Sequence, residues 1–219
     1  MQTDEVYLST AYFGNIQYFS KFVAFQKVHI EQHENYIKQS FRNRCEILTA
    51  NGKLALVIPV ERNAGNKILI RDVCISYAQP WQNSHWRALE TAYNSSPFFE
   101  YYFNDLKPFF TYKEKFLFDF NTKITNKILE LLEINKELFF TEKYKVCDND
   151  FMFDCRNSIS PKTAWQKRDL TFAPQKYYQV FAQKFGFTAN LSIIDLLFNE
   201  GTNAKEELTK CIIRCGNIV

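Results

Sequence analysis

Glycine and proline are scarce in this chain, with six of each among 219 residues, and the sequence has no low-complexity tract and no block of like charges. Apolar residues make up 46% of the chain and charged residues 23%. These values are typical of globular proteins and exclude collagen-like and intrinsically disordered chains. The length suffices for one well-filled core and leaves little for a second. We therefore expect a single domain over residues 1–219.

Long hydrophobic runs are also lacking. No apolar segment approaches the roughly 20 residues that a membrane-spanning helix needs. The opening MQTDEVYLST has neither the basic region nor the apolar stretch of a signal peptide. The net charge is only +3, and the lysines are interleaved with glutamates rather than gathered in a basic stripe. We expect a cytoplasmic protein with no stable membrane insertion and no nucleic-acid partner.

No CxxC pair occurs, which argues against a zinc ribbon or a thioredoxin-like site. The six cysteines are scattered, and we expect free thiols at Cys45, Cys74, Cys147, Cys155, Cys211 and Cys215. Cys211 and Cys215 have helical spacing, but two sulfurs fall short of the usual four zinc ligands, so we expect no metal site. The sequence has no GxGxxG, Walker A, GxSxG or HExxH motif, which argues against dinucleotide binding, P-loop chemistry, α/β-hydrolase chemistry and zincin chemistry and leaves the cofactor unknown.

The first third of the chain predicts an α/β fold. EVYLST and KVHIEQ have strand character and flank the helical pattern IQYFSKFVAF, which is a βαβ-type unit with parallel strands. Asn51-Gly52 lies between two strand-like runs and predicts a hairpin with a type I′ turn. KILIRDVCIS predicts one more strand. We expect a mixed sheet, opened by the βαβ-type unit and flanked by helices.

The remainder is mainly helical. Apolar spacing predicts helices within residues 81–102 and 121–137, and Ser96-Pro97 fits an N-cap followed by proline at the first helical position. NLSIIDLLFNEG predicts a helix that ends at Gly201. Residues 147–176 have weak periodicity and two prolines, and we interpret them as a long loop or lid.

Polar residues that follow the second predicted strand form the main candidate site. In open α/β sheets, ligands favour the crevice outside the carboxyl ends of parallel strands, and the turn after the first strand opens on that same edge. Guanidinium groups suit an anionic ligand because they pair two oxygens of a carboxylate or phosphate at once. One wall would carry Glu31, His33, Asn35, Lys38, Arg42, Asn43 and Arg44, and the other would carry Tyr12, Asn15 and Tyr18.

Each of these assignments has a structural alternative. The two arginines could instead form surface ion pairs with Glu31, Glu34 or Glu46. His33 and His85 are candidate proton-transfer groups because imidazole titrates near neutral pH. A lone histidine, however, is more often a surface or hydrogen-bonded residue, and His85 lies between two tryptophans, which favours its burial.

Several segments together resemble the WbqC-like protein family of bacteria. They are YFGNIQYFSKF, IEQHENYIKQSFRNRC, LALVIPVE, WQNSHWRALETAYNSSPFFEYY and YYQVFAQKFGFTANLSIIDLLFNEG. The positions that match the family motifs are Tyr12, Gly14, Tyr18, Glu31, Asn35, Lys38, Arg42, Asn43, Arg44, Trp81, His85, Tyr93, Pro97, Phe98, Ser192, Asp195 and Asn199. The resemblance departs from the family at Ser9-Thr10, where relatives have Gln-Pro, and at Glu31, where they have aspartate.

The resemblance implies an association with bacterial surface-polysaccharide (O-antigen) gene clusters. One hypothesis is an enzyme that acts on an anionic sugar-linked substrate, such as a sugar phosphate or nucleotide sugar, with acyl or aminoacyl transfer as the reaction. Arg42 and Arg44 would neutralise phosphate, and His33 or His85 would move a proton, oriented by Glu31 or Asp195. The alternative is a non-catalytic ligand-binding or scaffold protein for polysaccharide biosynthesis. Assembly as a homo-oligomer is left open.

Overall fold

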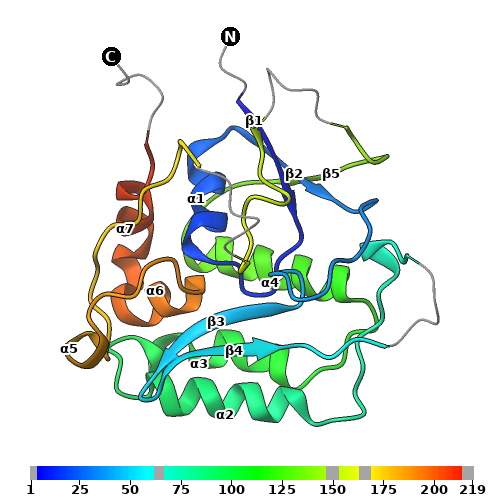
Figure 1. Ribbon diagram of the computed structural model, residues 1–219. Helices are drawn as coiled ribbons and strands as arrows, with labels where there is room; N and C mark the ends of the chain where they lie inside the picture. The colour runs from blue at the N-terminus through cyan, green and yellow to red at the C-terminus, as the bar shows by residue number, and fades with distance from the viewer. Residues whose placement is uncertain (1–3, 62–66, 147–152, 163–168, 214–219) are drawn as a thin grey trace.

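A computed structural model describes residues 4–61, 67–146, 153–162 and 169–213 (Figure 1). The strands are β1 Glu5–Ser9, β2 Lys27–Glu31, β3 Arg44–Thr49, β4 Gly52–Val57, β5 Leu138–Phe140 and β6 Phe153–Asp154. The helices are α1 Ile16–Ala24, α2 Trp81–Tyr93, α3 Phe99–Leu106, α4 Leu117–Leu131, α5 Ala182–Phe185, α6 Ile193–Glu200 and α7 Ala204–Lys210. Short 3₁₀ helices cover Ile70–Asp72, Lys107–Phe110 and Gly201–Asn203.

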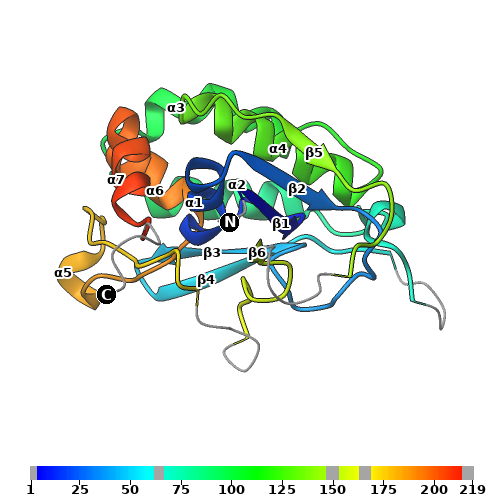
Figure 2. The same ribbon diagram turned by 90° about the horizontal axis from the view of Figure 1, so that it is seen from above.

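The α/β class and the βαβ opening are confirmed. β1, β2, β5 and β6 form a parallel sheet in the order β5-β2-β1-β6, with α1 connecting β1 to β2. The predicted hairpin is present as β3–β4, and it forms a two-stranded antiparallel sheet of its own. Parallel and antiparallel pairings therefore occur in separate sheets of the described chain. Figure 2 shows the hairpin on one side of the parallel sheet and α3 and α4 on the other.

Apolar side chains on one face of the parallel sheet join the core. Val6, Leu8, Val28 and Ile30 alternate along β1 and β2, and all four are buried. They pack in one cluster with residues of α1, α2, α4 and α6. The alternate residues of the same strands point to the opposite face, because successive strand side chains alternate. Those residues include Ser9 and Glu31, which are paired at the carboxyl ends of the two strands.

Three details of the sequence prediction are corrected. The segment 67–76 is not a strand, because its hydrogen bonds go to three different segments, at residues 34–36, 59–61 and 115–117, rather than to one partner strand. The hairpin turn is not type I′, because Gly52 has positive φ and Asn51 does not. The helices predicted within residues 81–102 are present as α2 and α3. Ser96 is not their N-cap, since its hydroxyl donates to the Tyr93 carbonyl and Phe98 precedes α3 instead.

The predicted helix near the end of the chain is confirmed, since α6 ends at Gly201, whose φ of 57° suits glycine. The long segment 147–176 contributes to the sheet through β6, so the part of it that the structure describes is not wholly loop. Residues 147–152 and 163–168 lie outside the described chain, as do Cys147 and Cys215. None of the helices in the described part is long and apolar enough to cross a membrane.

Candidate functional site

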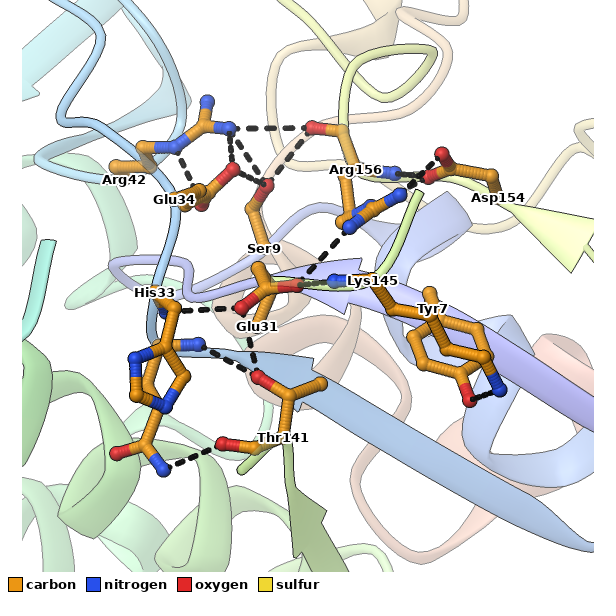
Figure 3. A network of polar contacts seen from close by, with 11 residues as sticks. Tyr7, Ser9, Glu31, His33, Glu34, Arg42, Thr141, Lys145, Asp154 and Arg156 are labelled. Carbon is orange, nitrogen blue, oxygen red and sulfur yellow. Dashed lines mark hydrogen bonds and ion pairs between the residues drawn. The ribbon is translucent and has the colours of Figure 1, made fainter. Parts of the chain in front are cut away.

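Two ion pairs are buried side by side at the carboxyl ends of the parallel strands (Figure 3). The Arg42 guanidinium donates from Nε to Glu34 Oε1 at 2.8 Å and from Nη2 to Glu34 Oε2 at 2.5 Å. Arg156 donates from Nη1 to Glu31 Oε2 at 2.9 Å. The side chains of Glu31 and Arg156 are 0% and 2% exposed. These pairs are therefore interior groups, unlike the surface ion pairs that were the alternative interpretation of this segment.

Ser9 joins the two pairs. Its hydroxyl accepts a hydrogen bond from Arg42 Nη2 at 2.7 Å and lies 2.8 Å from the Arg156 carbonyl and 3.2 Å from Glu34 Oε2, to either of which it can donate. Ser9, the last residue of β1, thus contacts residues of both ion pairs.

Residues from the other two parallel strands complete the network. Thr141, directly after β5, donates its hydroxyl to Glu31 Oε1 at 2.7 Å. Asp154 at the end of β6 accepts from Arg156 Nε at 2.9 Å and from Nη2 at 2.7 Å. Lys145 donates to the Tyr7 hydroxyl at 3.0 Å. All four strands end at the same edge because they are parallel, and this brings groups from four distant segments together.

Among the residues that the structure describes, the charges of the network balance. Three carboxylates, from Glu31, Glu34 and Asp154, face three cations, from Arg42, Arg156 and Lys145. An anionic ligand would meet guanidinium groups that already have carboxylate partners. A ligand rich in hydroxyl groups, by contrast, would find both donors and acceptors, because carboxylates only accept hydrogen bonds and guanidinium groups only donate them.

A small pocket lies next to this network. It is lined by Ser9, Thr10, Ala11, Gly14, Asn15, Tyr18, Phe41, Arg42, Cys155, Arg156 and Ile159. Its volume is about 10 Å³, which is room for roughly one water molecule. One wall is the turn after β1, and the other is the segment after β6. A sugar can therefore enter only if these walls separate.

The N-terminus of α1 reaches the pocket, but its amide groups have internal partners. The amide of Ile16 donates to the Leu191 carbonyl, that of Gln17 to Asn190 Oδ1, and that of Tyr18 to Asn15 Oδ1. In dinucleotide-binding folds the corresponding amides hold a phosphate. Here the segment at residues 190–191 occupies that position, so a phosphate cannot use this helix end without displacing it.

Gly14 fixes the shape of the turn after β1. A Cβ atom at this position would lie 2.5 Å from Cδ1 of the Tyr18 ring, and Tyr18 is buried. The preceding residue, Phe13, has a φ of 39°, which is uncommon for a residue other than glycine. The turn therefore brings its backbone and the aromatic ring into contact at the floor of the pocket.

The structure brings together only part of the predicted site. The pocket is lined by three residues of the predicted site, Asn15, Tyr18 and Arg42, and by Arg156, which was not predicted. Glu31 lies next to the pocket because it is hydrogen-bonded to Arg156. His33 contributes its backbone amide, which donates to Glu31 Oε1 at 2.8 Å. Asn35 and Lys38 are exposed, and neither lines the pocket. Asn43 is buried, with its amide donating to the Ile58 carbonyl.

Arg44 lies on the hairpin rather than in the pocket. It shares a face of β3 with Glu46, whose Oε1 is 3.9 Å from Arg44 Nη2. Arg42 and Arg44, which are two residues apart, therefore lie on different surfaces. Of the two, only Arg42 lines the pocket beside the network.

His85 and its predicted neighbours are core residues. His85 Nδ1 lies 3.0 Å from the Tyr12 hydroxyl, and the imidazole also bonds the Val57 backbone, so both ring nitrogens have partners. Burial lowers the pKa of His85 to about 4, and the bond to Val57 offsets this only in part. Trp81 packs on both Tyr12 and His85. Tyr12, Trp81 and His85 are not among the residues that line the pocket.

Asp195 is a buried carboxyl between α6 and α2. It accepts from the Tyr93 hydroxyl at 2.7 Å, from the Tyr177 hydroxyl at 2.5 Å and from Gln179 Nε2 at 3.2 Å. Burial raises the pKa of Asp195, although these three hydrogen bonds act in the opposite direction. Its partners tie α6 to α2 and to residues 177–179. The geometry thus gives Asp195 a role in packing and none in the pocket.

The residues of the network that were not among the predicted site residues are Tyr7, Ser9, Glu34, Thr141, Lys145, Asp154 and Arg156. The only signal that pointed to Asp154 and Arg156 was their place in the long segment 147–176, because long connections are often functional. Thr141 and Lys145 follow a three-residue strand that has no alternating pattern long enough to predict. Nothing in the sequence pairs these residues with Glu31.

Comparison with known proteins gives the same family as the sequence motifs. The pattern of the WbqC-like protein family matches residues 10–207. The chain belongs to the WbqC-like protein family. It is also similar to the uncharacterized protein Rv1507c of Mycobacterium tuberculosis, with 26% identity over 91% of this chain and 92% of that protein. No solved structure matches the chain. The match over residues 10–207 includes every residue of the pocket except Ser9.

Proposed function

We propose that this WbqC-like protein is a cytoplasmic transferase of bacterial surface-polysaccharide or nucleotide-sugar metabolism. It acts on an anionic sugar-linked substrate, and acyl or aminoacyl transfer is the reaction class. The observation that carries the proposal is the pair of buried guanidinium–carboxylate contacts joined by Ser9 at the carboxyl edge of the sheet.

The cost of burying these charges supports a functional role. Removing two charges from water costs several kcal/mol per ion, and well-packed apolar residues are often as stable or more stable at such positions. A fold that only needed stability would gain little from two such pairs in contact with each other. Their place at the carboxyl ends of parallel strands is where α/β sheets bind ligands. Family membership supports the link to polysaccharide metabolism.

The balanced charge of the network favours the sugar as the part of the substrate that enters the pocket. Arg42 and Arg156 would donate to sugar hydroxyls, and Ser9 would donate to them or accept from them. Glu31 would accept the proton of the sugar group that attacks the acyl carbon, and would pass it to the leaving group of the donor as the bond between that group and the acyl carbon breaks. Phosphate groups would remain outside, because the helix N-terminus is already occupied by residues 190–191.

A matched pair of variants tests the proposal. The wild-type protein is incubated with nucleotide sugars and with acyl and aminoacyl donors, and the products are followed by mass spectrometry. Glu31→Gln keeps the shape of a 0% exposed side chain and removes its charge, and it should abolish turnover. Glu137→Gln makes the same change at an exposed position and should leave turnover intact. No product with any donor, or full activity of Glu31→Gln, would overturn the proposal.

A non-catalytic binding or scaffold role is the second candidate. It is favoured by the closed geometry of the site: each guanidinium group of the network already pairs with a carboxylate, and the pocket has room for only about one water molecule. On this alternative, a sugar nucleotide would raise the unfolding temperature of the wild type without being converted. Loss of that stabilisation in Glu31→Gln would place the binding at this edge.

A further inference from the structure

The pocket beside the ion pairs has two walls, and the turn after β1 is firmly anchored in the core. The carbonyl of Gly14 accepts from the amide of Ile193 at 2.9 Å. The carbonyl of Phe13 accepts from the Ser192 hydroxyl at 2.7 Å. The Phe13 ring is 1% exposed and stacks on Phe110, with 5.9 Å between the ring centroids. This turn therefore cannot move without disturbing α6 and the aromatic core.

The opposite wall, residues 155–159, is attached at the edge of the parallel sheet. It follows β6, which is an edge strand and pairs with β1 over only two residues. Arg156 joins this wall to the carboxyl ends of β1 and β2 (Figure 3). Its carbonyl oxygen lies 2.8 Å from the Ser9 hydroxyl, and its Nη1 donates to Glu31 Oε2 at 2.9 Å. The contacts of one residue thus connect the wall to both strands.

The wall is a compact turn with a natural pivot at its first residue. The amide of Cys155 donates to the Tyr7 carbonyl at 2.9 Å, which ties the start of the turn to β1. The amide of Ile159 donates back to the Cys155 carbonyl, so this bond lies within the turn and need not break when the turn swings.

We propose that the pocket opens when residues 156–159 swing outward about Cys155, and that the Arg156–Glu31 ion pair is the latch that holds it closed. The movement would enlarge a pocket that has room for roughly one water molecule, while the turn after β1 stays in place. Arg156 would then lie on the wall that has moved and could bond an entering molecule in place of Glu31. The inference concerns how the pocket opens and is independent of which molecule enters.

Two cysteines report separately on the two walls. Cys155 lines the pocket and is 7% exposed. Cys45 is 1% exposed, and its thiol bonds Ser192, which anchors the turn after β1. Burial raises the pKa of both thiols, and alkylating reagents attack the thiolate, so both react slowly until they are uncovered. Movement of residues 156–159 uncovers Cys155 alone, whereas movement of the other wall or global unfolding also uncovers Cys45.

A matched pair of isosteric variants tests the latch. In Glu31→Gln the amide nitrogen takes the place of Oε2 and meets the Arg156 guanidinium donor to donor, because Oε1 already accepts two hydrogen bonds. Glu34→Gln removes the other buried carboxylate charge, which is held by Arg42, and leaves the latch intact. The two glutamate side chains are 0% and 6% exposed, so the changes are comparable in burial.

A second latch variant leaves both carboxylates unchanged. Arg156→Lys keeps the positive charge but lacks the planar fork that bonds Glu31 and Asp154 together. It should weaken the latch as well, and it repeats the test if Glu31→Gln does not fold.

The proteins are treated with N-ethylmaleimide under native conditions, and peptide mass spectrometry follows each thiol. When opening is fast relative to alkylation, the rate reports the population of the open form. We expect Cys155 to react about tenfold faster or more in Glu31→Gln than in the wild type, because a hydrogen-bonded charge is lost. Glu34→Gln should match the wild type, and Cys45 should stay protected throughout. Unchanged labelling of Cys155 in both latch variants, equal acceleration in Glu34→Gln, or labelling of Cys45 alongside Cys155 in both latch variants would overturn the inference.

Discussion

The burial of His85 predicts a loss of stability in mild acid. The folded protein holds this imidazole neutral, with a pKa of about 4 against 6.5 in the unfolded chain. The unfolded state therefore gains a proton first as the pH falls. The contribution of His85 to stability is constant above pH 6.5, falls as the pH drops from 6.5 towards 4, and changes no further below that. At pH 5 the difference corresponds to about 2 kcal/mol.

Urea unfolding at pH 7.5 and pH 5 measures this effect. His85→Gln keeps an acceptor for the Tyr12 hydroxyl and a donor for the Val57 carbonyl but cannot titrate, so its stability should fall about 2 kcal/mol less than that of the wild type. Tyr12→Phe keeps the buried imidazole and should retain the wild-type pH dependence. An identical pH dependence in the wild type and His85→Gln would refute the reasoning, because His85 would then titrate alike in both states.

Three further predictions concern stability. Arg42→Met leaves the Glu34 carboxylate buried without its partner and should lower the free energy of unfolding by about 3–5 kcal/mol. The double variant that also carries Glu34→Gln should lose clearly less. Urea unfolding of the wild type, Arg42→Met and the double variant checks this. Gly14→Ala places a methyl group against the Tyr18 ring and should lower the free energy of unfolding by about 1–3 kcal/mol. Burial alone would raise the pKa of Asp169, but the Lys21 ammonium holds it below its ordinary value of 3.8. The stabilisation from ionised Asp169 is thus present above pH 3.8 and lost as the pH falls through the lowered pKa. In Asp169→Asn, the urea concentration at the unfolding midpoint should therefore depend less on pH over that acid range than it does in the wild type.

Local patterns were enough to predict the elements around the site. The spacing of apolar residues identified β1, α1 and β2, and the order of these elements placed the turn after β1 and Glu31 at one edge of a parallel sheet. The Asn51-Gly52 pair located the hairpin, although the turn type was wrong because only Gly52 needs positive φ. The segment 67–76 failed for a different reason. It has strand-like residues, but its hydrogen bonds are divided among three segments of the chain.

The composition of the site depended on contacts that no local pattern encodes. Arg42 and Arg44 are two residues apart and equivalent as sequence, yet one is paired with Glu34 in the interior and the other lies on the hairpin. Arg156 reaches Glu31 across 125 positions, because β6 joins the sheet beside β1. His85 matched the expectation for a histidine between tryptophans, since its ring is buried. The family resemblance marked many of these positions without separating pocket from core.

A crystal structure with a nucleotide sugar bound tests the central claim most directly. We predict sugar density in an opened pocket, with hydroxyl groups within hydrogen-bonding distance of Ser9, Arg42 and Arg156, and with the phosphates outside the N-terminus of α1. Ligand density elsewhere on the protein, with both buried ion pairs and the closed pocket unchanged, would contradict the account.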